Sequence, residues 1–102
     1  MEYIVDRFKR YISVDTQSDE FSDTTPSTEK QYDLARMLRD ELEAMGVSNV
    51  RLDEDRCYVY GMIPANTDTD RSIGFISHMD TASAAPGDAS GCRIVNNNQF
   101  II

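Results

Sequence analysis

The residues of this 102-residue sequence that are best suited to chemistry are His78 and Asp80, which one residue separates. They follow the apolar run of residues 73–76, which is typical of a strand buried on both faces of a parallel sheet. Side chains two positions apart in an extended chain point to the same side, so we expect the imidazole and the carboxylate to lie together. Because ligand sites form at the carboxyl ends of strands in open α/β sheets, this pair is a candidate site.

Two interpretations of the pair stay open on the residues alone. A histidine that binds zinc usually donates its other ring N–H to a carboxylate or carbonyl group, and Asp80 is placed to accept that bond or to influence a metal-bound water. Ser77 and Thr81 can add hydrogen bonds around the same site. A histidine and an aspartate at a strand end can also form a purely structural pair. Because a two-residue motif is weak evidence, the pair by itself favours the structural interpretation.

The sequence offers few other metal ligands or nucleophiles, which limits the reactions that this chain could catalyse by itself. His78 is the only histidine, whereas a catalytic zinc site needs about three protein ligands and a general base, so other ligands would have to come from outside this chain. Ser77 and Ser83 lack the G-x-S-x-G turn of serine hydrolases. Cys57 lies in an apolar run that disfavours a thiolate. We therefore expect none of these side chains to act as a nucleophile.

Composition and charge narrow the classes of partner. The chain has 10 Lys and Arg against 18 Asp and Glu, a net charge of -8 and no basic run, which argues against nucleic acid or a membrane as partner. No apolar stretch approaches the ~20 residues that span a bilayer, and a signal-peptide pattern is lacking. Cys57 and Cys92 form no C-x-x-C motif and are predicted to be reduced, buried thiols. The predicted location is cytoplasmic.

Hydrophobic periodicity predicts two helices. Apolar residues recur at helical spacing over residues 2–12, and again over a second segment that ends near Met45. Thr28 and Gln31 fit a capping box at the start of the second helix, and Gly46 suits the left-handed position after its end. Residues 13–26 and 81–91 are loops by composition.

Strands are predicted to follow the helices. The pattern indicates strands over residues 47–52 and 57–63, the buried strand over 73–76, and a hairpin with arms at 94–95 and 100–102. Asp68 and Asp70 precede the buried strand and should lie at the end opposite His78. The predicted fold is therefore α/β, with two helices and then a mixed sheet in one domain over residues 1–102. Because the chain stops inside an apolar run, we expect it to be truncated.

Five segments match a known family in order and spacing, and together they span nearly the whole chain. They are residues 11–18 (YISVDTQS), 26–29 (PSTE) with Gln31, 41–46 (ELEAMG), 63–66 (IPAN) and 73–81 (IGFISHMDT). They resemble the N-terminal part of the peptidase T family, the tripeptide aminopeptidases among the di-zinc exopeptidases. Met79 stands where that family suggests a small β-branched residue, and the segment that follows Asp80 fits poorly.

The resemblance implies a role for each residue of the pair: His78 as a zinc ligand, and Asp80 as the catalytic-site carboxylate that orients it or tunes the metal-bound water. It implies the N-terminal portion of a zinc-exopeptidase catalytic domain, which in complete form holds two Zn²⁺ ions, takes small peptides, namely tripeptides, and can form a homodimer. The general base and most metal ligands lie further along the family's sequence, so the isolated chain is expected to be inactive. The alternative is a truncated, non-catalytic α/β module with at most weak metal binding.

Overall fold

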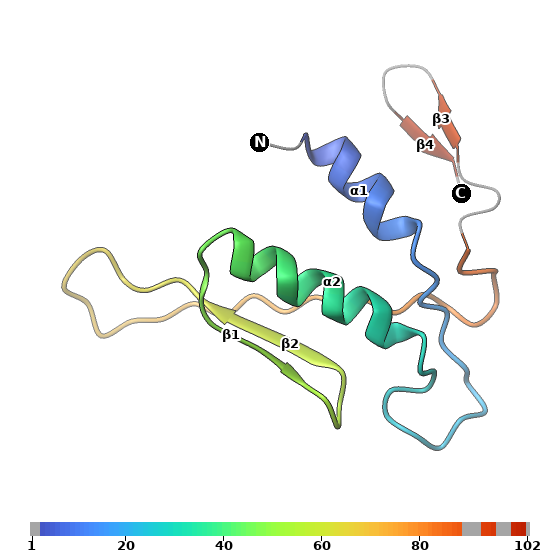
Figure 1. Ribbon diagram of the computed structural model, residues 1–102, viewed down its shortest axis with the longest axis horizontal. Coiled ribbons are helices and arrows are strands. Elements are labelled where there is room, and N and C mark those ends of the chain that lie inside the picture. The colour runs from blue at the N-terminus through green and yellow to red at the C-terminus, as the bar shows by residue number, and fades with distance from the viewer. Residues whose placement is uncertain (1–2, 89–92, 96–98, 102) are drawn as a thin grey trace.

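Two helices lead the chain, as the periodicity predicts. The computed structural model describes residues 3–88, 93–95 and 99–101, and its helices are α1 (Ile4–Ile12) and α2 (Gln31–Ala44) (Figure 1). α1 buries none of its residues, whereas α2 buries one face near its start. Glu41 of α2 joins the two helices, because its carboxylate pairs with Arg7 and Arg10 and accepts the Tyr11 hydroxyl.

The start of α2 differs from the predicted capping box. Lys30 is the N-cap residue and provides no side-chain cap. The Thr28 hydroxyl donates instead to the main-chain oxygen of Gln17 at 2.8 Å, and Nε2 of the Gln31 side chain donates to the Thr28 hydroxyl oxygen at 3.0 Å. The prediction was wrong because the Thr28 oxygen accepts the side chain of Gln31 instead of a main-chain N–H of the helix, while the hydroxyl proton is donated to the preceding loop.

The end of α2 agrees with the sequence. Gly46 has φ of +81°, the left-handed conformation that glycine adopts without a steric penalty. The amide of Gly46 donates to the Glu43 carbonyl at 3.0 Å, and that of Val47 donates to the Leu42 carbonyl at 3.1 Å. These two bonds form a Schellman motif, which satisfies carbonyl groups at the helix end.

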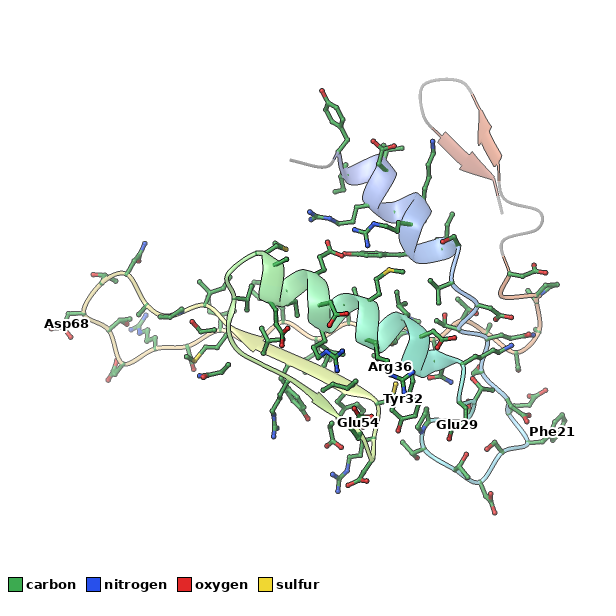
Figure 2. All side chains as sticks on the ribbon, viewed as in Figure 1. Phe21, Glu29, Tyr32, Arg36, Glu54 and Asp68 are labelled. Carbon is green, nitrogen blue, oxygen red and sulfur yellow. The ribbon has the colours of Figure 1, made fainter. Side chains whose placement is uncertain are left out.

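A two-stranded antiparallel sheet follows and carries the core. Strands β1 (Ser48–Asp53) and β2 (Tyr58–Met62) form the predicted hairpin, and α2 packs on it. The buried cluster consists of Tyr32, Ala35 and Cys57, with three partly buried side chains against it: Leu52, Val59 and Met79. Figure 2 shows Tyr32 beside Glu54 at the hairpin turn, where the tyrosine hydroxyl donates to the Glu54 carbonyl oxygen.

A second antiparallel hairpin, β3 (Arg93–Val95) with β4 (Gln99–Ile101), lies near the end of the chain where the sequence predicts one. Residue 102 and the hairpin's central residues 96–98 lie outside the described residues. The α/β class is confirmed, with two helices followed by strands. Both hairpins are antiparallel, and the parallel pairing within the described residues is one isolated bridge between Gln17 and Thr81.

The strand predicted over residues 73–76 is not formed. Ile73, Phe75 and Ile76 are 83%, 94% and 101% exposed. A strand buried on both faces needs hydrogen-bonded neighbours and covering helices, and the described part of the chain places neither beside this segment. The radius of gyration is 15.9 Å, larger than the roughly 13 Å of a compact chain of this length, in agreement with the exposure of this segment. Among the described helices, none is long and apolar enough to cross a membrane.

Candidate metal-ligand site at His78 and Asp80

The predicted pair is in contact. The Nδ1 atom of His78 lies 3.0 Å from Oδ1 of Asp80 and 2.9 Å from the main-chain oxygen of the same residue. A carbonyl oxygen can only accept, so Nδ1 carries the proton and donates to Asp80. In the neutral ring the lone pair then resides on Nε2, the nitrogen left for a ligand. The imidazole is 85% exposed, so Nε2 is accessible.

Met79 anchors the pair between its two members. Its side chain packs against the buried cluster under α2, while His78 on one side of it is exposed and Asp80 on the other is half-exposed. Neighbouring side chains in an extended segment alternate in direction, so an inward Met79 turns both functional side chains outward. The methionine that departs from the family pattern therefore fills an apolar position.

The loop after α1 holds the same segment by main-chain pairing. The hydroxyl of Thr16 donates to the Met79 carbonyl oxygen at 2.9 Å, and the Thr81 amide donates to the Thr16 carbonyl oxygen at 3.1 Å. The amide and the hydroxyl of Ser18 both donate to the Thr81 carbonyl oxygen, at 2.9 and 2.8 Å. Residues 16–18 and 79–81 thus pair side by side, with Gln17 opposite Thr81 in the parallel bridge.

Polar contacts hold this loop in turn. Asp15 forms a 3.0 Å ion pair with Lys30 and accepts the amide of Gln17 at 3.0 Å; the amide first, and the lysine next, lower the pKa of the Asp15 carboxyl group. The Gln17 side chain donates to the Ser83 carbonyl oxygen at 3.0 Å. Gly87 lies so close that a Cβ there would fall 2.9 Å from the Gln17 main-chain nitrogen, which requires glycine.

Sequence reasoning missed the part that residues 15–18 play. Their composition predicts a loop, and that much is confirmed. The available signal was the concentration of short hydroxyl and carboxyl side chains, which bond readily to nearby main-chain groups. Nothing in the spacing indicated that their partners lie more than 60 residues later in the chain.

The other candidates stand apart from the pair. The Ser77 hydroxyl lies 3.5 Å from the His78 carbonyl oxygen, a long contact. Thr81 bonds to Thr16 and Ser18 through its main-chain groups. Ser83 has its carbonyl oxygen engaged by Gln17. Asp68 lies at the tip of a loop, as Figure 2 shows, and the strand at whose opposite end it was predicted to lie is not formed.

Cys57, the cysteine within the described residues, shows no sign of reactivity. Cys57 is buried and free, and burial raises the pKa of its thiol, so the thiolate is disfavoured as predicted. Cys92 lies outside the described residues. A nucleophilic role for Cys57 therefore gains no support.

The metal-binding capacity of the described residues is limited to one good imidazole nitrogen. His78 fits a metal ligand, because its Nε2 is accessible and its other nitrogen is bonded to a carboxylate, the arrangement usual in zinc proteins. Within residues 3–88, 93–95 and 99–101 no group of three His, Cys, Asp or Glu side chains could hold a metal ion. The residues present therefore fit part of a metal site.

No protein-family model matches the chain. Similar curated proteins do exist: the chain is 47% identical over 98 residues to a protein named Peptidase T from Desulfitobacterium hafniense, a match over 95% of the chain. It is 52% identical over 93 residues to Peptidase T of Geobacillus thermodenitrificans, and 47% identical over 100 residues to that of Aliivibrio fischeri, over 90% and 97% of the chain. The chain resembles peptidase T. This likeness confirms the resemblance drawn from the five segments.

The match to peptidase T covers nearly all of this chain but only a part of each relative. The matches cover 22–24% of these relatives, so the chain spans about a quarter of the length of the curated relatives that it matches. On the side of this chain, a match over 95% of its residues takes in both helices, the first hairpin and the segment with His78 and Asp80. Both candidate residues thus belong to the part that resembles peptidase T.

Proposed function

We propose that this chain is the N-terminal segment of a zinc-dependent aminopeptidase that removes the N-terminal residue from tripeptides. The similarity to proteins named Peptidase T supports the class of enzyme. The observation that carries the proposal is the hydrogen bond from His78 Nδ1 to Asp80, because it leaves Nε2 accessible as a ligand atom.

The two residues have different parts in this proposal. His78 acts as a metal ligand through Nε2. Asp80 fixes the tautomer and orientation of the ring and raises the basicity of the ligating nitrogen. Two Zn²⁺ ions in the complete site supply Lewis acidity toward the scissile carbonyl group. The remaining ligands and the general base come from outside this chain. We place the complete enzyme in the cytoplasm, with the capacity to form a homodimer and with no nucleic acid or membrane partner.

A second candidate function is a non-catalytic α/β module with at most weak metal affinity. One observation favours it: the described residues contain no group of three possible metal ligands. A lone imidazole with one carboxylate beside it binds zinc weakly, because catalytic sites use about three protein ligands.

The native gene product, purified from its source, distinguishes the two functions. Its intact mass, its zinc content and its release of the N-terminal residue from a tripeptide are measured together. The enzyme proposal expects a mass above 11.6 kDa, bound zinc and hydrolysis. A native product of 11.6 kDa that holds no zinc and cleaves no tripeptide would favour the module.

Variants of the same product test the residues. His78→Ala is expected to abolish zinc binding at its site and hydrolysis, and Asp80→Asn is expected to weaken zinc affinity by about 10–100-fold. Asp68→Asn, at the remote loop tip in Figure 2, is the matched control and should change neither quantity. Full zinc content and full hydrolysis in His78→Ala would contradict the assignment.

A further inference from the structure

We propose that Thr16 is a positioning residue for the His78 and Asp80 pair, and that its buried hydroxyl sets the tautomer of the imidazole. The importance of that tautomer for a metal rests on the proposed function. The hydrogen bond on which the inference rests, from Thr16 Oγ1 to the Met79 carbonyl oxygen, does not depend on it.

Thr16 bonds to the main chain on both sides of Asp80. Thr16 is only 2% exposed. Its hydroxyl donates to the carbonyl oxygen of Met79, the residue before Asp80. Its own carbonyl oxygen accepts the amide of Thr81, the residue after Asp80. With both flanking peptide groups held, the position of Asp80 and the direction of its side chain are defined.

His78 depends on Asp80 for its place. Within the described residues, the segment 72–78 forms no hydrogen bond to another segment of the chain, and the imidazole bonds only to the carboxylate and carbonyl oxygens of Asp80. Those two oxygens are the acceptors that keep the proton on Nδ1. The order of dependence therefore runs from Thr16 to Met79, to Asp80 and then to the ring.

A variant that lacks only the Thr16 hydroxyl tests whether the hydrogen bond to Met79, and not the packing of the side chain, positions Asp80. Thr16→Val keeps the shape of the side chain but leaves the partly buried Met79 carbonyl oxygen without its partner, a loss that a folded chain relieves by moving that group toward water. Asp80 moves with it and loosens from the ring. Thr16→Ser restores the donor and should restore the tautomer. Tyr11→Phe is the matched control, because it also loses one partly buried hydroxyl bond, of 2.9 Å to Glu41, far from the pair in the chain.

The lone histidine makes the test direct. Long-range ¹H–¹⁵N correlation spectra of the ¹⁵N-labelled chain, recorded about two pH units above the ordinary histidine pKa of ~6.5, report the tautomer of one ring. We expect the Nδ1–H form in the unchanged chain, in Thr16→Ser and in Tyr11→Phe. In Thr16→Val the ratio of the Nδ1–H form to the Nε2–H form should fall by about fivefold, the factor that corresponds to one net hydrogen bond.

An Nδ1–H ratio in folded Thr16→Val equal to that of the unchanged chain would overturn the inference. An equal fall in Tyr11→Phe would also overturn it, since the tautomer would then follow stability alone. If Thr16→Val does not fold, Ser18→Ala replaces it, because that variant removes one of two bonds to the Thr81 carbonyl oxygen. Its ratio should fall in the same direction by a smaller factor, and an unchanged ratio would refute the inference.

Failure of the proposed function gives a different result. If the native product holds no zinc and cleaves no tripeptide, yet the tautomer responds to Thr16→Val, the positioning role stands and the pair is structural. If zinc binds and His78→Ala removes it while the tautomer ignores Thr16, the function stands and the positioning role fails. Where both hold, Thr16→Val in the native product should lower zinc affinity by about tenfold, and Thr16→Ser should restore it.

Discussion

Replacement of Glu41 by alanine should detach α1 from α2. One carboxylate joins the two helices: Oε1 lies 2.8 Å from Arg7 Nε, while Oε2 lies 3.1 Å from Arg10 Nη2 and 2.9 Å from the Tyr11 hydroxyl. α1 buries no residue of its own, so these polar bonds carry an unusually large share of its attachment. Glu41→Ala removes all three of them.

The expected loss in the free energy of unfolding is roughly 2.5–3.5 kcal/mol. The Glu41 side chain is 14% exposed, but those of Arg7 and Arg10 are 33% and 36% exposed, so solvent screens each ion pair to about 0.5–1 kcal/mol. A partly buried hydroxyl bond to a carboxylate adds ~1.5 kcal/mol. Glu41→Gln keeps one acceptor oxygen and should lose about half as much.

Urea denaturation followed by circular dichroism measures this loss, and limited digestion with trypsin reports the release of α1 by faster cleavage after its basic residues. Glu43→Ala, two positions along the same helix and exposed, is the matched control and should stay within about 0.5 kcal/mol of the unchanged chain. Added salt should reduce the difference between Glu41→Ala and the unchanged chain, because the arginine pairs are partly exposed. A loss in Glu41→Ala no larger than that of the control would refute the reasoning and assign the attachment of α1 to apolar contacts.

Two further predictions concern acid stability and self-association. Nearby main-chain amide groups hold the pKa of the Asp15 and Asp53 carboxyl groups below the ordinary 3.8. The stability that these carboxylates contribute is therefore fully present above pH 3.8 and is lost as the pH falls through the lower, folded-state pKa values. Asp53→Asn should reduce the acid dependence of unfolding seen by circular dichroism, and an unchanged profile would contradict this. Phe75 and Ile76, 94% and 101% exposed on an unpaired segment, should promote association, and the double change to threonine should lower the sedimentation-detected oligomer fraction with little change in stability; an unaltered fraction would exclude this segment as the route.

Local elements were predictable because their causes are local. The apolar spacing of α1 and α2, the left-handed Gly46 and the β1–β2 hairpin all depend on residues within a few positions of one another. The capping box failed because the Thr28 hydroxyl donates to a loop residue, Gln17, and accepts the side-chain amide of Gln31 in place of a main-chain N–H. The strand over residues 73–76 failed because strand formation needs partners that the local pattern does not supply.

Some features of the candidate site also followed from the sequence, and others depended on the tertiary structure. Sequence alone determined that His78 and Asp80 are the pair to consider, that they share one side of the chain, and that a single imidazole falls short of a catalytic metal site. Only the tertiary structure decided which ring nitrogen carries the proton and that Thr16 holds the segment. The bond from Thr16 to Met79 joins residues 63 positions apart. The free energy that selects it comes from packing Met79 against the core and satisfying buried main-chain groups, which no local pattern encodes.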